Sequence, residues 1–185
     1  MKGLILAGGK SSRMGEDKAL LDINGLSFIE HTKRLLLSCA CEDVLINHNT
    51  LTNCIPDIHT DKGPTSGIHA ALSWLEKDMS TTPLLVSAVD TPFMPSSALQ
   101  QLIEYGQTHK TSCYYGNLYL PVFIYDTENA LNWLNTILPP KNAKGPSLRM
   151  LYNAIEAKKL DNSCGDWINI NQPSDYQVAR RQAQN

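Results

Sequence analysis

The chain has 185 residues, of which 42% are hydrophobic and 18% are charged, as in an ordinary soluble globule. We expect residues 1–185 to form a single domain with a sizeable core. The formal net charge of −2 gives no global positive field that would attract nucleic acid or an anionic membrane, and no apolar run approaches the ~20 residues that a membrane-spanning helix needs.

The chain opens on a short apolar run over residues 2–6, which predicts a buried strand. Gly8 and Gly9 follow, and their lack of side chains lets a ligand approach main-chain N–H groups. Arg13 and Lys18 then place two cations beside these groups. Backbone donors together with two positive charges predict an anion site, most naturally for phosphate.

Two well-known phosphate-binding loops do not fit this stretch. The dinucleotide fingerprint requires Gly-x-Gly-x-x-Gly, a spacing that does not occur here. The P-loop requires a glycine five positions before its Gly-Lys-Ser, and Leu4 occupies that position before Gly9. For the glycine pair alone, an ordinary turn after a strand is the competing interpretation.

Strand and helix patterns alternate through the first half of the chain. The turn pair Asn24-Gly25 closes a short extended piece, and Ser27 with Glu30 has the form of a capping box. In chain order we predict an extended piece at 19–23, a helix from about 27 to 38, a strand at 44–46, a weaker strand at 54–59, a loop at 61–67, a helix after that loop that is broken at 81–83, and a strand at 84–89. The predicted helix has Ile68, Ala71, Leu72 and Leu75 on one face.

The second half mixes helices with one hairpin. Two strand-like runs flank Gly116-Asn117, which predicts antiparallel pairing. In chain order we predict a helix at 96–105, strands at 111–115 and 119–124, helices at 128–137 and about 147–157, a strand at 167–171, and a polar helix opened by Pro173 and Ser174 with a frayed tail over about 178–185. The alternation predicts an α/β fold with a mainly parallel sheet, helices on both faces and some antiparallel pairing.

The ends of the predicted strands carry the polar residues of interest. In such sheets ligands bind beyond the carboxyl ends of the strands. We therefore expect four strand ends to converge in space: Gly8-Gly9, Asn47-His48-Asn49, Asp61 and Asp90. Asp90 directly follows the mostly apolar run at 84–89, so it lies at the rim of the core. It is either a solvated turn residue or a ligand for Mg²⁺, which prefers one or two carboxylates combined with phosphate oxygens.

The cysteine and histidine patterns point to no metal framework. The cysteines are odd in number and contain no Cys-x-x-Cys pair, and the histidines are scattered. We interpret the cysteines as buried small hydrophobes and expect a reducing, cytoplasmic location, with no signal peptide at the N-terminus. The cysteines are Cys39, Cys41, Cys54, Cys113 and Cys164.

Residues 6–21, Leu-Ala-Gly-Gly-Lys-Ser-Ser-Arg-Met-Gly-Glu-Asp-Lys-Ala-Leu-Leu, resemble the signature loop of nucleotidyltransferases, and more narrowly that of the MobA-like molybdenum cofactor guanylyltransferases. Three further segments resemble motifs of that family: Gly-Pro-Thr-Ser-Gly-Ile at 63–68, Asp-Thr-Pro-Phe at 90–93 and Asn-Ile-Asn-Gln-Pro-Ser-Asp at 169–175. Val89, Gln172 and Thr65-Ser66 depart from the family's usual residues, and none of these departures removes a charged group.

The resemblance implies a Rossmann-like fold of the nucleotide-diphospho-sugar transferase type and a reaction. A terminal phosphate of molybdenum-loaded molybdopterin attacks the α-phosphorus of GTP, and pyrophosphate leaves. Mg²⁺ is the implied cofactor. GTP and molybdenum–molybdopterin are the implied substrates, and other proteins of molybdenum cofactor biosynthesis and apo-molybdoenzymes are the implied protein partners.

The resemblance also implies roles for individual residues. It assigns catalysis to Arg13, Lys18 and Asp90, and the metal to Asp90. Asn169 and Asn171 fall on the acceptor side, where strand-end hydrogen bonding is the competing interpretation. Nucleotide binding is assigned to Leu6, Ala7, Gly8, Gly9, Gly15, Lys18, Asn47, Asp61, Gly63, Gly67 and Asp90.

Two alternatives remain open at this point. The first is another nucleotidyltransferase of the same fold, which transfers CMP to molybdopterin or a nucleotide to a sugar phosphate. The second is a non-catalytic nucleotide-binding adaptor that keeps the fold, although a binder has no need of Arg13, Lys18 and Asp90 together.

Overall fold

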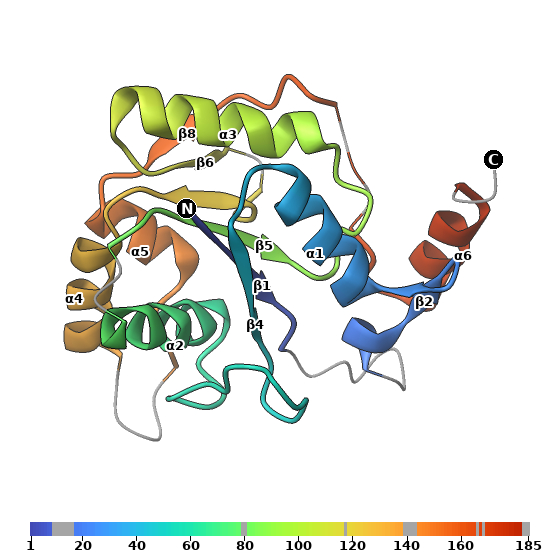
Figure 1. Cartoon of the computed structure of the whole chain (residues 1–185), viewed down its shortest axis with the longest axis horizontal. Helices are drawn as coiled ribbons and strands as arrows, with labels where there is room; N and C mark the ends of the chain where they lie inside the picture. Colours follow the sequence, from blue (N-terminus) through green and yellow to red (C-terminus); the bar gives the residue numbers. More distant parts are fainter. Residues whose placement is uncertain are drawn as a thin grey trace.

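A computed structural model describes residues 1–8, 17–78, 81–116, 118–138, 144–165, 167 and 169–182 (Figure 1). The predicted positions Gly9, Arg13 and Gly15 lie outside these residues. The strands are β1 (Lys2–Leu6), β2 (Asp22–Ile23), β3 (Leu26–Ser27), β4 (Asp43–Asn47), β5 (Leu84–Ala88), β6 (Cys113–Tyr115), β7 (Val122–Ile124) and β8 (Lys158–Leu160). The helices are η1 (Lys18–Leu20), α1 (Phe28–Ser38), α2 (Pro64–Lys77), α3 (Ser96–His109), α4 (Thr127–Ile137), α5 (Leu148–Ala154) and α6 (Pro173–Gln182).

One six-stranded sheet organises the fold, in the order β4-β1-β5-β7-β6-β8. Strand β1 pairs in parallel with both β4 and β5, and β6 pairs in parallel with β8. Strand β7 is antiparallel to β5 and β6. The predicted sheet, mainly parallel with some antiparallel pairing, is therefore confirmed, and so is the antiparallel pairing around residue 116.

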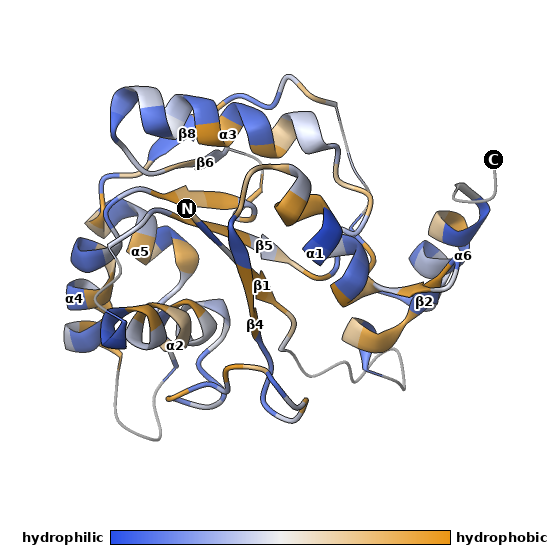
Figure 2. Cartoon of the chain, in the orientation of Figure 1, coloured by the Kyte–Doolittle hydropathy of each residue, from blue (hydrophilic) through white to orange (hydrophobic). Residues whose placement is uncertain are grey.

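Helices cover both faces of this sheet, as predicted (Figure 1). Side chains alternate between the faces along each strand, so Leu4 packs into one hydrophobic cluster and Ile5 into the other. The cluster with Leu4 includes apolar residues of α2, α4 and α5, and the cluster with Ile5 includes those of α1 and α3. The central strands β1 and β5 are accordingly mostly hydrophobic (Figure 2), which is the pattern of a buried parallel sheet.

A small two-stranded sheet follows η1 and leads into α1. Asn24 and Gly25 both have positive φ, which the hairpin turn between β2 and β3 requires. The Ser27 hydroxyl accepts from the Glu30 N–H, and the Glu30 carboxylate accepts from the Ser27 N–H, so the predicted capping box of α1 is present. Helix α6 lies beside this hairpin (Figure 1), where the Tyr176 hydroxyl donates to the Asp22 carbonyl.

Three local predictions were wrong. The described residues of 167–171 form no strand. Trp167 and Ile170 pack into the core, and the Ile170 N–H donates to the Asp90 carbonyl without forming a ladder. The stretch 54–59 contributes one isolated bridge, between Ile55 and Asn47, and no strand. Strand β8 was missed, since its polar sequence Lys-Lys-Leu suits an edge strand that one neighbour covers.

The cysteines are free thiols, and three of them are buried. Burial raises the pKa of Cys41 to about 11 and that of Cys113 to about 12. These thiols therefore stay protonated and pack as small hydrophobes.

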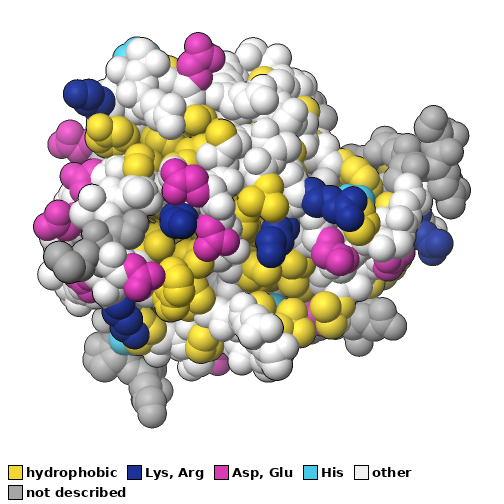
Figure 3. Space-filling view, viewed as in Figure 1, with side chains coloured by type: hydrophobic (Ala, Val, Ile, Leu, Met, Phe, Trp, Pro, Cys, Tyr) yellow, Lys and Arg dark blue, Asp and Glu magenta, His cyan; other side chains and the backbone are white. Residues whose placement is uncertain are grey.

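The surface carries charge of both signs. Figure 3 shows Lys and Arg side chains interspersed with Asp and Glu across the face drawn, among exposed hydrophobic groups. Within the described part of the chain, no helix is both long enough and apolar enough to cross a membrane.

Candidate active site

A cleft of about 820 Å³ opens at the carboxyl ends of β1, β4 and β5. Its walls come from the residues that follow these strands, from the start of α2 and from η1. The lining residues are Leu6, Ala7, Gly8, Asp17, Lys18, Asn47, His48, Asn49, Thr50, Asp57, Asp61, Gly63, Pro64, Ala88, Val89, Asp90 and Leu120. A cleft at this edge is where ligands bind in open α/β sheets.

The floor of the cleft is the rim of the sheet itself. The Ala7 N–H donates to the Asn47 carbonyl at 3.0 Å, and the Val89 N–H donates to the Leu6 carbonyl at 3.1 Å. These bonds extend the parallel ladders past the strand ends, so the three strands present their next residues side by side. Gly8 follows directly and carries the backbone toward the residues that the structure does not describe.

Asn47 is held in one orientation by two acceptors. Its Nδ2 donates to the Ile55 carbonyl at 2.9 Å and to Asp57 Oδ1 at 3.0 Å. Its Oδ1 faces Gly67, where a Cβ would lie 2.3 Å away. Asn47 is almost fully buried, so this amide is a fixed feature of the cleft wall.

The start of α2 forms another wall. Asp61 and Gly63 have positive φ, and the turn that they make delivers Pro64 as the first residue of the helix. The predicted helix thus begins earlier than expected, and Gly67 lies in its first turn rather than in a loop. Because the N-terminal end of a helix carries partial positive charge and N–H donors, this wall favours an anion.

Asp90 and Lys18 supply charge of opposite sign to the same cleft. Burial raises the pKa of the Asp90 carboxyl, and the nearby positive charge of Lys18 lowers it in part. The carboxylate is therefore costly to keep ionised in the absence of further cations. This is the environment expected of a carboxylate that holds a divalent cation.

The C-terminal segment returns to these two residues. The Ile170 N–H donates to the Asp90 carbonyl at 2.8 Å, and Lys18 Nζ donates to Asn171 Oδ1 at 3.3 Å. Residues about 80 and 150 positions apart in the sequence thus meet at one edge of the cleft. The asparagine pair at 169 and 171 is absent from the cleft lining itself, although Asn171 contacts a residue that lines it.

The predicted convergence is therefore found for most of the described residues. Leu6, Ala7, Gly8, Lys18, Asn47, Asp61, Gly63 and Asp90 line the cleft, and Gly67 packs behind Asn47. Their individual roles stay predictions.

The sequence interpretation missed several residues of the site. Asp17 lies inside the signature loop, but the sequence assigns it no role. His48 and Asn49 were expected at the converging strand ends and do line the cleft, but neither was given a function. Asp57 belongs to the stretch 54–59, for which we predict a weak strand, and Thr50 precedes that stretch. Position was the signal that indicated His48 and Asn49, because they directly follow strand β4.

The site fits a cation held by few protein ligands. No group of three or more His, Cys, Asp or Glu side chains in the described ranges is arranged to hold a metal ion. Asp90, in a cleft that also favours phosphate, suits Mg²⁺, which needs only one or two carboxylates and takes its remaining ligands from phosphate oxygens and water.

The family described as "MobA-like NTP transferase domain" matches residues 3–145. The molybdenum cofactor guanylyltransferase of Xanthomonas euvesicatoria is 29% identical over 178 residues, covering 94% of this chain and 91% of that protein. The molybdenum cofactor guanylyltransferase of Rhodobacter capsulatus is 28% identical over 186 residues, with the same coverage. The crystal structure of molybdopterin-guanine dinucleotide biosynthesis protein A from Archaeoglobus fulgidus superposes with a TM-score of 0.75 at 20% identity, over 100% of this chain and 99% of that one.

Proposed function

Because the chain belongs to the MobA-like NTP transferase family, we propose that it transfers GMP from GTP to the phosphate of molybdenum-loaded molybdopterin. The observation that carries the proposal is the cleft in which Lys18, Asp90 and the start of α2 face one another. We further propose that the chain acts as a single domain in the cytoplasm.

The proposed reaction moves negative charge. An ionised oxygen of the acceptor phosphate forms a bond to the α-phosphorus of GTP, the bond from that phosphorus to the bridging oxygen breaks, and pyrophosphate leaves. No general base is required, since the attacking phosphate is already ionised. Catalysis is then positioning and electrostatic stabilisation.

Lys18, Arg13 and the loop backbone are the groups that we assign to the phosphates. Lys18 neutralises phosphate oxygens while Asn171 holds its ammonium group at the edge of the cleft. Gly8, Gly9 and Gly15 let the backbone approach, and Arg13 adds a second cation. Pro64 and the residues after it present the positive end of α2 to the same anion.

Asp90 is the residue that would hold Mg²⁺. When bound, the ion supplies a Lewis acid and a template for the phosphate oxygens. The pKa of the Asp90 carboxyl is raised because burial desolvates the charged form, and a bound cation would offset that cost. The link from Ile170 N–H to the Asp90 carbonyl fixes the backbone that carries this carboxylate.

Guanine selection is assigned to Asn47 and to the backbone of Leu6 and Ala7. The Ala7 N–H already donates to the Asn47 carbonyl, so it has no proton left for the base. The Asn47 amide presents its Oδ1, because its Nδ2 is committed to Ile55 and Asp57. An amide oxygen accepts from the N1–H and N2–H groups of guanine. Asp61, Gly63 and Gly67 shape the rest of the nucleotide wall.

Asn169 and Asn171 are assigned to the acceptor. The hydrogen bond from Lys18 to Asn171 supports this assignment, because Lys18 is the residue that we assign to the phosphates. An acceptor phosphate bound there would approach GTP from the side of Asp90.

The test is guanylylation in vitro with purified protein, GTP, Mg²⁺ and molybdenum-loaded molybdopterin. We expect pyrophosphate release and a product whose mass equals that of the cofactor plus GMP. CTP and ATP serve as competing donors in parallel reactions. A preference for CTP would contradict the guanine assignment, and GTP binding without pyrophosphate release would favour a nucleotide-binding adaptor.

A further inference from the structure

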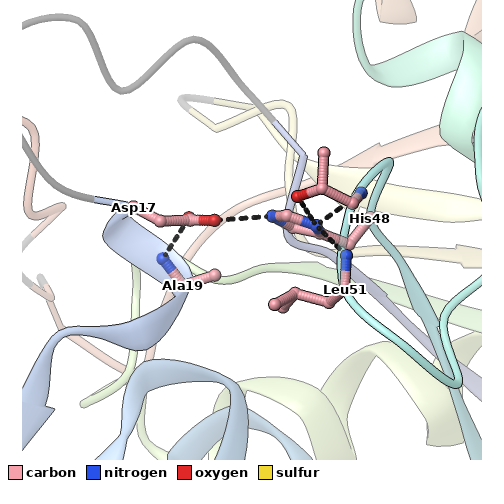
Figure 4. A network of polar contacts seen from close by, with 5 residues as sticks. Asp17, Ala19, His48 and Leu51 are labelled. Atoms are coloured by element: carbon pink, nitrogen blue, oxygen red, sulfur yellow. Dashed lines mark hydrogen bonds and ion pairs between the residues drawn. The ribbon is translucent and has the colours of Figure 1, made fainter.

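His48 joins the segment after β4 to the start of η1 (Figure 4). Its Nε2 lies 2.8 Å from Asp17 Oδ2. Its Nδ1 accepts from the backbone N–H groups of Thr50 and Leu51, each at 3.2 Å. The ring is buried, with 7% of its surface exposed, although it lines the cleft.

These contacts define the tautomer of the ring. Two backbone N–H groups point at Nδ1, so Nδ1 has no proton of its own and accepts. The ring proton of neutral histidine is then on Nε2, where it donates to the Asp17 carboxylate. The fold of residues 48–51 therefore turns His48 into a donor aimed across the cleft.

The two oxygens of Asp17 have separate partners. Oδ2 accepts from His48, and Oδ1 accepts from the Ala19 N–H at 3.0 Å, which caps η1. The first residue of η1 is Lys18. The carboxylate thus ties the backbone on both sides of Lys18 to the segment that follows β4.

We propose that His48 is a positioning residue for Lys18, acting through Asp17. Its Nε2–H fixes the Asp17 carboxylate, the carboxylate fixes η1, and η1 sets where the Lys18 ammonium group enters the cleft. The inference rests on the proposed function in one respect, namely that Lys18 contacts the phosphates of GTP. His48 itself need not touch the nucleotide or the acceptor.

Two substitutions separate the two nitrogens of the ring. His48→Gln keeps a donor near the position of Nε2, and His48→Asn keeps an acceptor near the position of Nδ1. If His48 acts through Asp17, His48→Gln retains function and His48→Asn loses it. If His48 merely shapes residues 48–51, the order is reversed.

The first measurement is GTP affinity by calorimetry with Mg²⁺ and no acceptor, so that no turnover occurs. We expect His48→Asn to weaken GTP binding on the order of tenfold, as loss of a hydrogen bond to a charged group implies. His48→Gln should stay within about threefold of the natural protein, since it retains that bond. Equal affinities for both variants and the natural protein would overturn the inference, as would a larger loss in His48→Gln.

Asp17→Asn supplies a second test by double-mutant cycle. Because the inferred effect passes through Asp17, combining Asp17→Asn with His48→Asn should weaken GTP binding no more than the worse single variant. Additive losses would overturn the inference. His69→Gln is the matched control: it also alters a buried histidine, in α2 and outside the cleft lining, and should leave GTP affinity unchanged.

The ring itself can be observed by ¹⁵N NMR of the histidine side chains. We expect a pyridine-type signal for His48 Nδ1, a pyrrole-type signal for Nε2, and a shift of the Nε2 signal in Asp17→Asn. A proton on Nδ1 would overturn the inference whatever the protein catalyses. A natural protein that binds GTP but forms no product would contradict the proposed function alone, because the affinity comparison still decides the role of His48.

Discussion

Asp90 is a half-buried carboxylate whose charged form is disfavoured by its partly desolvated environment, and this predicts its role. Substituting Asp90→Asn keeps the shape and removes the charge. We expect a loss in kcat on the order of a thousandfold, as removal of a metal ligand implies. Initial-rate measurements of pyrophosphate release at saturating GTP check this. Asp161→Asn, an exposed carboxylate outside the cleft lining, is the control, and normal turnover of Asp90→Asn would remove the metal assignment.

Asp90→Asn should raise the stability of the metal-free protein even though it lowers activity. Burial raises the pKa of Asp90 above its ordinary value of 3.8, so the folded protein binds that proton more tightly than the unfolded chain. Its contribution to stability therefore falls as pH rises from below 3.8 through the folded-state pKa. Without metal, Asp90→Asn should melt at a higher temperature than the natural protein at pH 7. The difference should vanish below about pH 3.8, and a lower melting temperature at pH 7 would contradict the argument.

Lys18 carries the opposite charge, which we expect to stabilise the phosphates of the bound nucleotide. Lys18→Ala should lower kcat/KM by about a hundredfold to a thousandfold, the effect of removing one group that stabilises developing charge. Steady-state kinetics with varied GTP measure it. Lys33→Ala, an exposed lysine on α1, should behave as the natural protein. A small rise in KM with unchanged kcat would contradict a role of Lys18 in stabilising developing charge.

At the level of single residues, the sequence predicted the charged groups of the site well, but it did not predict the side chains that hold them in position. Asp90 stands out because the mostly apolar run at 84–89 precedes it, and Lys18 because it follows a glycine-rich loop. Asp17 and His48 carry no such pattern, since their contact joins residues 31 positions apart and depends on how the segment after β4 folds. A contact of that kind is a property of the assembled cleft.

Among the elements, helix α2 packs closely against the site at its start, through Gly67. Gly67→Ala would put a Cβ 2.3 Å from Asn47 Oδ1 and 2.7 Å from Leu6 Cδ2. We expect overpacking to lower the free energy of unfolding by about 1–3 kcal/mol. The displaced Asn47 amide should also weaken GTP binding. Thermal unfolding and GTP calorimetry measure the two effects.

Gly106→Ala is the matched control for this prediction. It also adds a methyl group to a buried helical glycine, in α3, where the Cβ would lie 2.2 Å from the Phe123 ring. It should lower stability to a similar degree while GTP affinity stays unchanged. Weaker GTP binding in both variants would show that general loosening, rather than the Asn47 contact, is responsible.

Strong local patterns fixed the identity of most elements, and tertiary contacts decided the remainder. Strands β1, β4 and β5 are short apolar runs, and the capping box placed the start of α1 within one residue. Strand β8 escaped because an edge strand needs little apolar sequence. Residues 167–171 misled in the other direction, since Trp167 and Ile170 serve the core without pairing in the sheet.

For the whole molecule, the decisive feature is that the end of the chain returns to its beginning. Tyr176 packs edge-on against Phe28 and donates to the Asp22 carbonyl. Just before it, Asp175 Oδ2 accepts from the backbone N–H groups of Asn171 and Gln172 at 2.9 and 3.0 Å. Asn171 in turn accepts from Lys18. The C-terminal helix therefore holds one side of the cleft, which no local stretch of sequence reveals.

Asp175→Ala should loosen this hold without unfolding the protein. We expect kcat/KM to fall by at most about tenfold, the change that one ordinary hydrogen bond can produce. Asp126→Ala, which removes the carboxylate that caps α4 by accepting from Asn129 N–H, should alter the melting temperature without altering transfer.

Hydrogen bonds from the Asn171 and Gln172 backbone lower the pKa of Asp175 from its ordinary value of 3.8. Its hold is therefore complete above that value and lost as pH falls through the lowered pKa, so the defect of Asp175→Ala should be constant across neutral pH. A defect that changed between pH 6 and pH 8 would place its origin in another group.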